Sequence, residues 1–435
     1  MKILVVATQI PPYIGSGNIR ALNYINYLAK LGHQIDVLGV DYPKDSIAYD
    51  SKLEEAFDKR VNVYRISPGF FYKFFYRKKM KDLDNNIDIS KHVSINNTVK
   101  GKVNTFIKNT MVIPDVFMFW IYPAYKFAKK LMKNKDYDIL FSLHETPSSH
   151  IVAYLLKRRF KFIRWVGYWS DPWNGDSLRN NRSILKKFIE EKIERKIVEK
   201  VDKLLFTTEK TKRLYIDKYD LNPKKTSIVL RGYDKQQYID IINKESLNLK
   251  GIEFNKLNIV YVGTIYRHLR DINPLYNALN LLKSNDINLY NKLNIIFVGQ
   301  FDHYSDQEKL QKHNNIKIYP LVPYKQALRY TVKADVLLLY GNKESTQVPG
   351  KVYEYLGSPA IILTLLGDLN DELKDIMEDV KKGPVILNDE NELYLALKKL
   401  AEDYISNNLN ENWMKPVGKY EWENVAKDLE MKLIN

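Results

Sequence analysis

The sequence contains no cysteine, so disulfide bonds, thiolate metal sites and cysteine nucleophiles are excluded. It also lacks a long apolar run. The longest, Val116 to Tyr122, ends at Pro123 and is far shorter than the ~20 residues of a membrane span. The apolar amino terminus is followed by Pro11-Pro12 instead of a small-residue cleavage site, which favours a buried strand over a signal peptide. We therefore expect a cytoplasmic protein, either soluble or peripheral on the inner face of the cell membrane.

Acidic residues are few relative to basic ones, 52 against 68, which leaves a formal net charge of +16. Such an excess favours polyanionic partners, namely nucleic acid, anionic lipid or phosphorylated substrates. The hydrophobic fraction of 45% is too high for a disordered chain, and 435 residues correspond to two or three folded domains.

Short apolar segments alternate with helical patterns along the chain, which is the signature of parallel α/β units. In the first half we expect strands over Lys2–Thr8, Ile35–Val40, Ile139–Leu143, Phe162–Gly167, Lys203–Thr207 and Thr226–Leu230. In the second half we expect them over Asn258–Val262, Ile295–Val298, Ile316–Tyr319, Val336–Tyr340 and Ala360–Leu363. Ligands of open α/β sheets lie at the carboxyl ends of the strands, so two facing halves would hold a ligand between them.

The strongest local signal is VPGKVYEYLG, Val348 to Gly357, which follows a predicted strand. A Gly–Lys pair that opens a helix makes an anion site, because backbone N–H groups and the helix dipole point at a phosphate and the lysine adds charge. Glu354 lies on the same helix face as Lys351, and its carboxylate can accept two hydrogen bonds from a ribose diol. An ordinary helix start with an ion pair explains the spacing equally well.

This segment resembles the donor-binding motif of GT-B glycosyltransferases, in particular glycosyltransferase family 4. The shared run is proline–x–lysine–x–x–glutamate–tyrosine–leucine, then a small residue and proline. The resemblance implies that Glu354 holds the donor ribose and that Lys351 lies near the phosphates. The family's two-glutamate form has its first glutamate where this chain has Thr346, and the nearest acid, Glu344, is out of register. The donor sugar therefore stays open.

Tyr261-Val262-Gly263-Thr264 resembles the first strand and loop of the family's donor domain, whose loop often offers an arginine and a lysine to the diphosphate. Thr264 occupies the arginine's place. Arg267, His268 and Arg270 are the nearby cationic candidates, with Arg267 ranked first, and a solvated loop is the alternative for each. The predicted donor-binding residues are Gly263, Thr264, Arg267, His268, Val322, Val348, Pro349, Gly350, Lys351 and Glu354.

The first half carries further similarities. Gly15-Ser16-Gly17 resembles the glycine loop that lies against the donor phosphates and acceptor, although a G-x-G alone is weak evidence. The segments Ser142 to Pro147 and Ser170 to Trp173 resemble landmarks of family members that build bacterial envelope polysaccharides. His144 and Asp171 follow strand ends, so we expect both to face the ligand and to act with Lys351 as catalytic residues. Loop capping is the alternative role for each.

Two segments resemble the family's interdomain crossings, namely Arg231 to Asp234 and Tyr420 to Glu423. We thus expect a GT-B fold of two facing Rossmann-like domains. The acceptor-side domain spans residues 1–232 with an insertion at about 65–109, the donor domain spans 233–415, and a helix in 416–435 crosses back. The resemblance covers nearly the whole chain outside the insertion.

No metal or other cofactor is expected. Asp136-Tyr137-Asp138 mimics the D-x-D metal motif of the other glycosyltransferase fold, but it precedes a predicted strand instead of ending one. In GT-B enzymes basic side chains and helix dipoles meet the phosphate charge without a metal.

The segment Phe71–Lys81 mixes aromatic and basic residues and has no acid. Such a stretch can lie in the headgroup layer of an anionic membrane, and a solvated basic helix is the alternative. If membrane contact is correct, changing Lys78, Lys79 and Lys81 to glutamate weakens binding to anionic vesicles.

Together these features predict a metal-independent hexosyltransferase that moves a sugar from a nucleoside diphosphate to a glycan, including a lipid-linked one. The family resemblance implies retention of the anomeric configuration and a role in bacterial cell-surface polysaccharide or glycoconjugate synthesis. The alternatives are a sugar-nucleotide epimerase of the same fold and a non-enzymatic polyanion-binding protein. No recognised nucleic-acid motif is present, so nucleic acid is not an expected partner.

Overall fold

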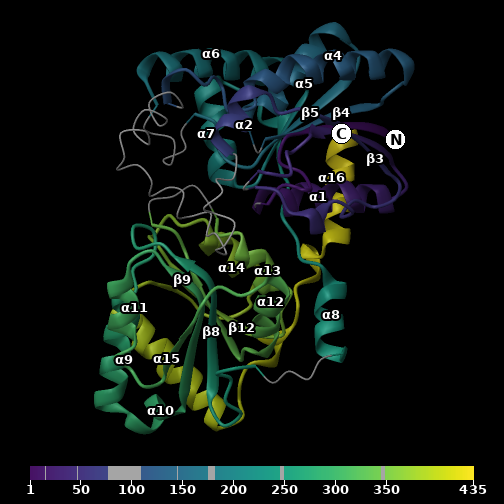
Figure 1. Ribbon diagram of the computed structural model, residues 1–435. Coiled ribbons are helices and arrows are strands. Elements are labelled where there is room, and N and C mark those ends of the chain that lie inside the picture. Colours follow the sequence, from purple (N-terminus) through teal and green to yellow (C-terminus); the bar gives the residue numbers. More distant parts are fainter. Residues whose placement is uncertain are drawn as a thin grey trace. The chain divides into compact units, whose positions relative to one another are not determined.

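The computed structural model describes residues 1–14, 16–46, 48–76, 109–144, 146–174, 182–244, 249–343 and 348–435. The chain forms two compact units (Figure 1). Unit 1 comprises Met1–Leu230 and Val425–Asn435, and unit 2 comprises Arg231–Asn424. Across the described ranges, no helix has both the length and the apolar character of a membrane span.

Unit 1 contains a seven-stranded parallel sheet with the strand order β3-β2-β1-β4-β5-β6-β7. The strands are β1 Lys2–Ala7, β2 Gln34–Val40, β3 Val61–Ile66, β4 Ile139–His144, β5 Arg164–Trp169, β6 Lys203–Phe206 and β7 Thr226–Ile228. The helices are α1 Ser16–Lys30, α2 Phe70–Tyr76, α4 Met118–Asn134, α5 Pro147–Arg159, α6 Ile184–Lys200 and α7 Glu209–Tyr219.

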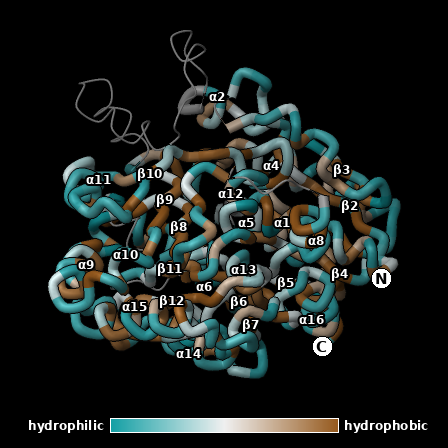
Figure 2. The backbone as a smooth tube through the Cα atoms, turned by 90° about the horizontal axis from the view of Figure 1, so that it is seen from below, coloured by the Kyte–Doolittle hydropathy of each residue, from teal (hydrophilic) through white to brown (hydrophobic). Residues whose placement is uncertain are grey.

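Helices cover both faces of this sheet. Figure 1 shows α4, α5 and α6 on one face and α1 on the other. The first face is sealed by one apolar core, in which alternate strand residues meet the inner sides of the helices. Representative members are Leu4, Val6, Leu140, Trp120, Ala124, Val152, Leu156 and Val198. Burial on both faces explains why the strands read as continuous apolar runs (Figure 2).

Unit 2 contains a six-stranded parallel sheet with the strand order β10-β9-β8-β11-β12-β13. Its strands are β8 Leu257–Ile265, β9 Leu293–Phe301, β10 Ile316–Tyr319, β11 Val336–Tyr340, β12 Ile361–Leu366 and β13 Val385–Leu387. Its helices are α8 Lys235–Lys244, α9 Asn273–Asn285, α10 Ile287–Lys292, α11 Tyr304–Leu310, α12 Tyr324–Lys333, α13 Lys351–Leu356, α14 Leu373–Val380 and α15 Glu390–Ile405.

Each sheet has a switch point at which the direction of strand succession reverses. In unit 1 it lies between β1 and β4, and in unit 2 it lies between β8 and β11. Strand β8 pairs with β9 over its whole length, but β11 pairs with it only at Ile259 and Val260. The carboxyl end of β8 is therefore open on its β11 side, where ligands of such sheets bind.

The chain crosses between the units twice, and the two segments are hydrogen-bonded side by side. The Tyr233 amide donates to the Tyr420 carbonyl at 2.8 Å, and the Trp422 amide donates to the Tyr233 carbonyl at 3.1 Å. Helix α16, Trp422–Ile434, then enters unit 1, where Glu430 Oε1 lies 2.7 Å from His33 Nε2. The Lys432 ammonium also donates to the Ile228 carbonyl. This bond joins α16 to β7, the last strand of unit 1.

The predicted α/β fold of two parallel sheets is confirmed. Most strand boundaries differ by one to three residues, and β8 and β9 extend further at their carboxyl ends than predicted. Strand β5 begins at Arg164 instead of Phe162, because Phe162 is fully exposed in the turn before it. Strands β3 and β13 had not been predicted. Strand β3 runs through Ile66, so Arg65 and Ile66, the first residues of the expected insertion, belong to the sheet of unit 1. Most of that insertion, residues 77–108, lies outside the described residues.

Candidate functional site

Helix α13 lies at the open side of β8 and holds the main chain of Val262. The Val262 amide donates to the Tyr355 hydroxyl at 3.0 Å, and the Lys351 ammonium donates to the Val262 carbonyl. Because β11 has already diverged from β8, these two side chains satisfy groups that a neighbouring strand would otherwise satisfy. The motif read from the sequence is thereby fixed at the switch point of unit 2.

Close packing against Gly263 sets the position of Lys351. The Lys351 Nζ lies 3.9 Å from the centroid of the Tyr261 ring, in a cation–π contact. A Cβ atom at Gly263 would lie 2.5 Å from this nitrogen, and the φ angle of Gly263 is +120°. The backbone conformation therefore favours glycine at this position, and the absence of a Cβ lets the lysine end keep its place.

The positive charge of Lys351 is only partly balanced by negative charge nearby. Burial lowers its pKa well below the usual value, the Arg270 guanidinium lowers it further, and the Glu354 carboxylate only partly opposes both effects. A bound phosphate would supply the missing negative charge. The electrostatics therefore favour an anionic ligand at the end of β8.

Arg270 belongs to the same group of side chains. It is buried, and its guanidinium donates to the Thr264 carbonyl at 2.7 Å, the Tyr261 hydroxyl at 2.9 Å and the Asn342 side chain at 3.1 Å. It thereby supports the loop after β8 while adding positive charge beside Lys351.

Arg267, the first-ranked cationic candidate in the sequence analysis, forms its contacts with α11 and not with Lys351. Its guanidinium forms an ion pair with Asp306 at the start of α11 and also donates to Ser305. His268 is exposed near the Tyr266 ring. The structure therefore brings Arg270, not Arg267, next to Lys351.

Glu354 lies one helical turn after Lys351 and is held from two sides. The Tyr324 hydroxyl donates to its carboxylate, and the Arg231 guanidinium is close enough to stabilise its charge. Burial is the larger effect and raises the pKa of Glu354 to about 7. A Cβ at Gly350 would lie 2.9 Å from Arg231 Nη1, so the glycine of the motif leaves room for this arginine.

The remaining predicted donor residues border this group. Val322 is partly exposed, two residues before Tyr324. Val348 is half-buried and Pro349 is buried before α13. This helix has only six residues, so side chains contribute more to any anion site here than a helix dipole does. Glu344 and Thr346 lie outside the described residues.

In unit 1, the predicted glycine loop follows β1. Gly15 lies outside the described residues, Ser16 opens α1, and Gly17 is buried. At the end of β1, the Thr8 hydroxyl lies 2.9 Å from that of Thr146, and the Thr8 amide donates to Ser149 at 3.1 Å. These contacts join the carboxyl ends of β1 and β4.

His144 is buried, with only 2% of its surface exposed, whereas the sequence had placed it facing the ligand. Its ring stacks on His150 with centroids 5.3 Å apart, and Trp169 and Trp173 lie against it. Aromatic packing, which sequence position could not show, explains the difference. His150 is a structural residue, because its Nδ1 is hydrogen-bonded to the Ser142 hydroxyl at 2.7 Å. Burial lowers the pKa of His150 to about 3, so its ring is neutral.

Asp171 is partly exposed and makes no hydrogen bond or ion pair within the described part of the chain. Its loop is nevertheless firmly anchored. The Ser170 hydroxyl donates to the His144 carbonyl at 2.7 Å, and the Trp173 amide donates to the Tyr215 hydroxyl at 3.0 Å. The loop presents a carboxylate at the end of β5 on a fixed backbone.

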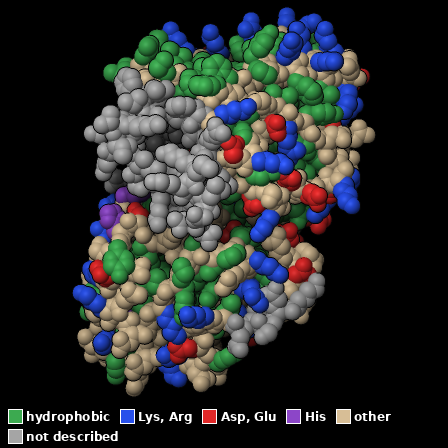
Figure 3. Space-filling model, viewed as in Figure 1, with side chains coloured by type: hydrophobic (Ala, Val, Ile, Leu, Met, Phe, Trp, Pro, Cys, Tyr) green, Lys and Arg blue, Asp and Glu red, His purple; other side chains and the backbone are tan. Residues whose placement is uncertain are grey.

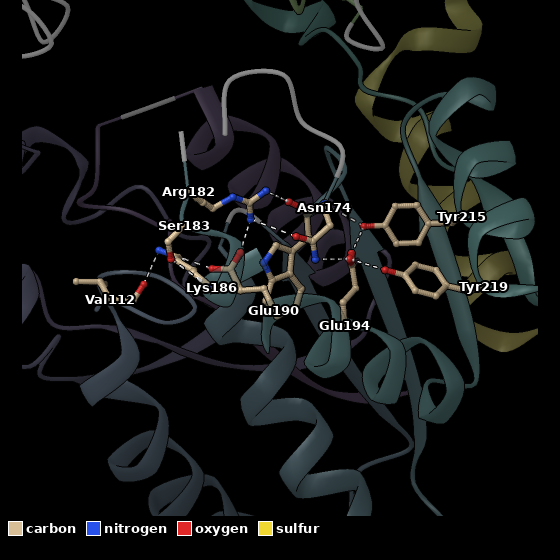
Figure 4. Close-up of polar contacts among 10 residues, drawn as sticks. Val112, Asn174, Arg182, Ser183, Lys186, Glu190, Glu194, Tyr215 and Tyr219 are labelled. Atoms are coloured by element: carbon tan, nitrogen blue, oxygen red, sulfur yellow. Dashed lines mark hydrogen bonds and ion pairs between the residues drawn. The ribbon is translucent and has the colours of Figure 1, made fainter. Parts of the chain in front are cut away.

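A buried polar network on α6 completes this anchor (Figure 4). Glu194 is fully buried and accepts hydrogen bonds from Asn174 at 2.8 Å, from Tyr219 at 2.6 Å and from Tyr215. Burial raises the pKa of Glu194. One turn earlier, Glu190 pairs with Arg182. No local pattern indicates this network, because its members come from the loop after β5, from α6 and from α7.

No group of three or more His, Asp or Glu side chains that could hold a metal is found among the described residues. Asp138 of the D-x-D mimic accepts a hydrogen bond from the Lys2 amide at 2.7 Å at the amino end of β4, whereas His144 ends the same strand.

Comparison with known proteins bears on the family and the fold. Residues 104–237 match the family model described as Glycosyltransferase Family 4, and no curated protein sequence matches the chain. The structure of HepE (Alr3699) from Anabaena in complex with UDP superposes with a TM-score of 0.61 and 11% identity, covering all of both chains.

Two further solved structures align with this chain over 99% of its length and 98% of their own length. Sucrose-phosphate synthase from Thermosynechococcus elongatus has a TM-score of 0.57 and 16% identity. WaaG, a glycosyltransferase involved in lipopolysaccharide biosynthesis, has a TM-score of 0.56 and 14% identity. These likenesses confirm the GT-B fold, and the family match confirms the resemblance to glycosyltransferase family 4.

Proposed function

We propose that this chain, a GT-B protein whose residues 104–237 match glycosyltransferase family 4, transfers a sugar from a nucleoside diphosphate to a glycan acceptor. The observation that carries the proposal is the position of Lys351 at the switch point of unit 2, beside Arg270 and one turn before Glu354. This arrangement suits a nucleoside diphosphate, whose negative phosphates and neutral ribose lie next to each other.

In this proposal the diphosphate lies along the Gly263–Thr264 loop and receives charge-assisted hydrogen bonds from Lys351. Arg270, which is hydrogen-bonded to the Thr264 carbonyl, adds positive potential beside Lys351. Glu354 accepts hydrogen bonds from the two ribose hydroxyls. As the bond to the sugar breaks, negative charge grows on the leaving diphosphate, and cations already in place stabilise that charge without reorganisation. The leaving phosphate can then assist attack on the same face, which would retain the anomeric configuration.

The acceptor side of the proposal rests on unit 1. Asp171 is a partly exposed carboxylate just after a strand end, so it is our candidate for orienting the acceptor. WaaG acts in lipopolysaccharide biosynthesis, which supports a cell-surface glycan as product. A lipid-linked acceptor would be held at a membrane, so peripheral membrane association is part of the proposal.

The donor can be identified by a thermal-shift screen of nucleotide sugars, because a ligand that binds only the folded protein raises its Tm. We expect one nucleoside diphosphate and its sugars to stabilise the protein. Transfer should then fall by at least about 100-fold in Lys351→Ala and in Glu354→Ala. Lys374→Ala changes an exposed lysine of unit 2 and is the matched control.

Near wild-type transfer in either site variant would contradict the donor assignment. Conversion of the donor in the absence of any acceptor would favour the epimerase alternative instead. Absence of stabilisation by every nucleotide, together with salt-dependent binding of nucleic acid, would favour a polyanion-binding protein.

A further inference from the structure

In the first three turns of α6, the distribution of buried and exposed side chains is the reverse of that in an ordinary surface helix. They bury charged side chains, namely Lys186, Glu190 and Glu194. They expose apolar ones instead: Ile184 is 88% exposed, Leu185 68% and Phe188 54%. Surface helices normally do the opposite, so these apolar side chains require an explanation other than packing within the chain.

The inversion follows from the buried network. Lys186 reaches inward to the Val112 carbonyl, Glu190 to Arg182, and Glu194 to Tyr215 and Tyr219 (Figure 4). With the inner side of the helix committed to these contacts, its apolar residues face outward. The orientation of the exposed residues is therefore fixed by the fold.

Helix α4 extends the apolar surface. Its inner side buries Trp120, Ala124 and Ala128, and its outer side exposes Phe119 and Tyr122. The segment before α4 lies against the start of α6, because the Ser183 amide donates to the Asn109 carbonyl at 3.2 Å. The exposed apolar members of this α4–α6 surface are Met111, Phe119, Tyr122, Ile184, Leu185 and Phe188.

The charge on the α4–α6 surface has one sign. Helix α4 contains four lysines and no acid. In the first three turns of α6, two of the three glutamates are buried, and the third, Glu191, pairs with Lys218. The exposed lysines are Lys126, Lys130, Lys133, Lys187 and Lys192. Figure 3 shows lysine and arginine side chains among apolar ones along this part of unit 1.

We propose that the α4–α6 surface docks unit 1 onto an anionic lipid bilayer. Lysines at the headgroup level would meet the lipid phosphates, and the apolar side chains between them would enter the boundary of the acyl chains. Nucleic acid would use the lysines but not the apolar residues, and a second copy of the chain would bring lysines against lysines. A bilayer is the partner that would contact both the lysines and the apolar side chains.

The surface differs from the one indicated by the sequence. Of the basic segment Phe71–Lys81, residues 77–81 lie outside the described residues. Helix α2 still contacts the α4–α6 surface, since the Phe71 ring lies 5.2 Å from that of Phe119. The proposal needs only described residues and does not depend on sugar transfer.

Vesicle co-sedimentation tests the proposal with two variants of the full chain. Vesicles of phosphatidylglycerol and phosphatidylcholine are compared with vesicles of phosphatidylcholine alone. The charge variant is Lys126→Glu, Lys130→Glu and Lys133→Glu, and we expect it to bind on the order of 100-fold more weakly, at roughly fivefold for each lysine. The apolar variant is Ile184→Ser, Leu185→Ser and Phe188→Ser, with an expected loss of about tenfold or more.

Matched controls lie on unit 2. Lys292→Glu, Lys312→Glu and Lys374→Glu reverse three exposed lysines, and Phe254→Ser, Ile287→Ser and Leu395→Ser replace three exposed apolar residues. Both controls should bind vesicles as the wild type does. Circular dichroism and nucleotide-induced thermal shifts should be unchanged in all variants, which separates this result from failure of the donor site.

Three results would overturn the proposal. They are equal binding to neutral vesicles, wild-type binding by the apolar variant, and complete displacement of the vesicles by a short RNA. The second result would leave only a charge effect. The third would assign the surface to nucleic acid.

Discussion

Replacement of Gly263 by alanine tests the donor site at a residue that has no charge of its own. The new Cβ would lie 2.5 Å from the Nζ and 3.3 Å from the Cε of Lys351. The end of the lysine is flexible, so we expect it to leave the Tyr261 ring and the Val262 carbonyl while the strand stays in place. The φ angle of +120° adds strain for any residue that has a Cβ.

The two effects have different sizes and different readouts. Backbone strain of this kind costs about 1–3 kcal/mol of folding free energy. A hydrogen bond to a charged group contributes about 1.5–3 kcal/mol, so displacing Lys351 should weaken nucleoside diphosphate binding by roughly 10- to 150-fold. Isothermal titration calorimetry with the diphosphate found by the thermal-shift screen measures the second effect, and the Tm reports the first.

Gly32→Ala separates strain from displacement. Gly32 has a φ angle of +92°, and a Cβ there would meet no atom within 4 Å. We expect this control to lower the Tm and to leave the Kd unchanged. The double variant Gly263→Ala, Lys351→Ala should bind no more weakly than Lys351→Ala alone, because both changes remove the same contact. An unchanged Kd in Gly263→Ala, or additive losses in the double variant, would refute the reasoning.

Three more predictions follow from the site and its supports. Burial raises the pKa of Glu354 to about 7, and its ionised form accepts the ribose hydroxyls, so affinity for a nucleotide sugar, which has no phosphate titrating in this range, should fall as pH decreases from about 8 to about 6, while Glu354→Gln should remove this fall. Arg270→Met should weaken nucleotide binding and Arg267→Met should not; the reverse order in calorimetry would restore the ranking made from sequence. Glu194→Ala leaves three buried donors unpaired and should lower the free energy of unfolding by about 3 kcal/mol, against about 1 kcal/mol for Glu194→Gln. Urea denaturation measures both, and equal losses would argue against the network.

Much of the fold could be predicted from sequence because its signals are local. The short apolar runs predicted as Ile316–Tyr319 and Val336–Tyr340 are β10 and β11 with the same bounds. Strand β13 was missed because it has only three residues, all half-buried, so it carries no apolar run. The register of β8 against β11 depends on contacts far apart in the chain, and no local pattern reveals where they part.

The candidate site shows the same limit. The pairing of Lys351 with Glu354 could be predicted from the sequence, because the two residues are only three positions apart. The roles of Arg267 and Arg270 are not, because Asp306, which pairs with Arg267, lies 39 positions along the chain. The burial of His144 likewise depends on Trp169 and Trp173, which a later strand and its loop supply.

The double crossing between the units has a consequence for synthesis of the protein. Unit 2 is one continuous stretch, Arg231–Asn424, whereas unit 1 also needs residues Val425–Asn435. During translation, unit 2 can complete its contacts as soon as it has emerged from the ribosome. Unit 1 begins first yet must wait for the contacts of Glu430 and Lys432 before its own chain is closed. The last contacts of unit 1 can therefore form only after all of unit 2 has been synthesised.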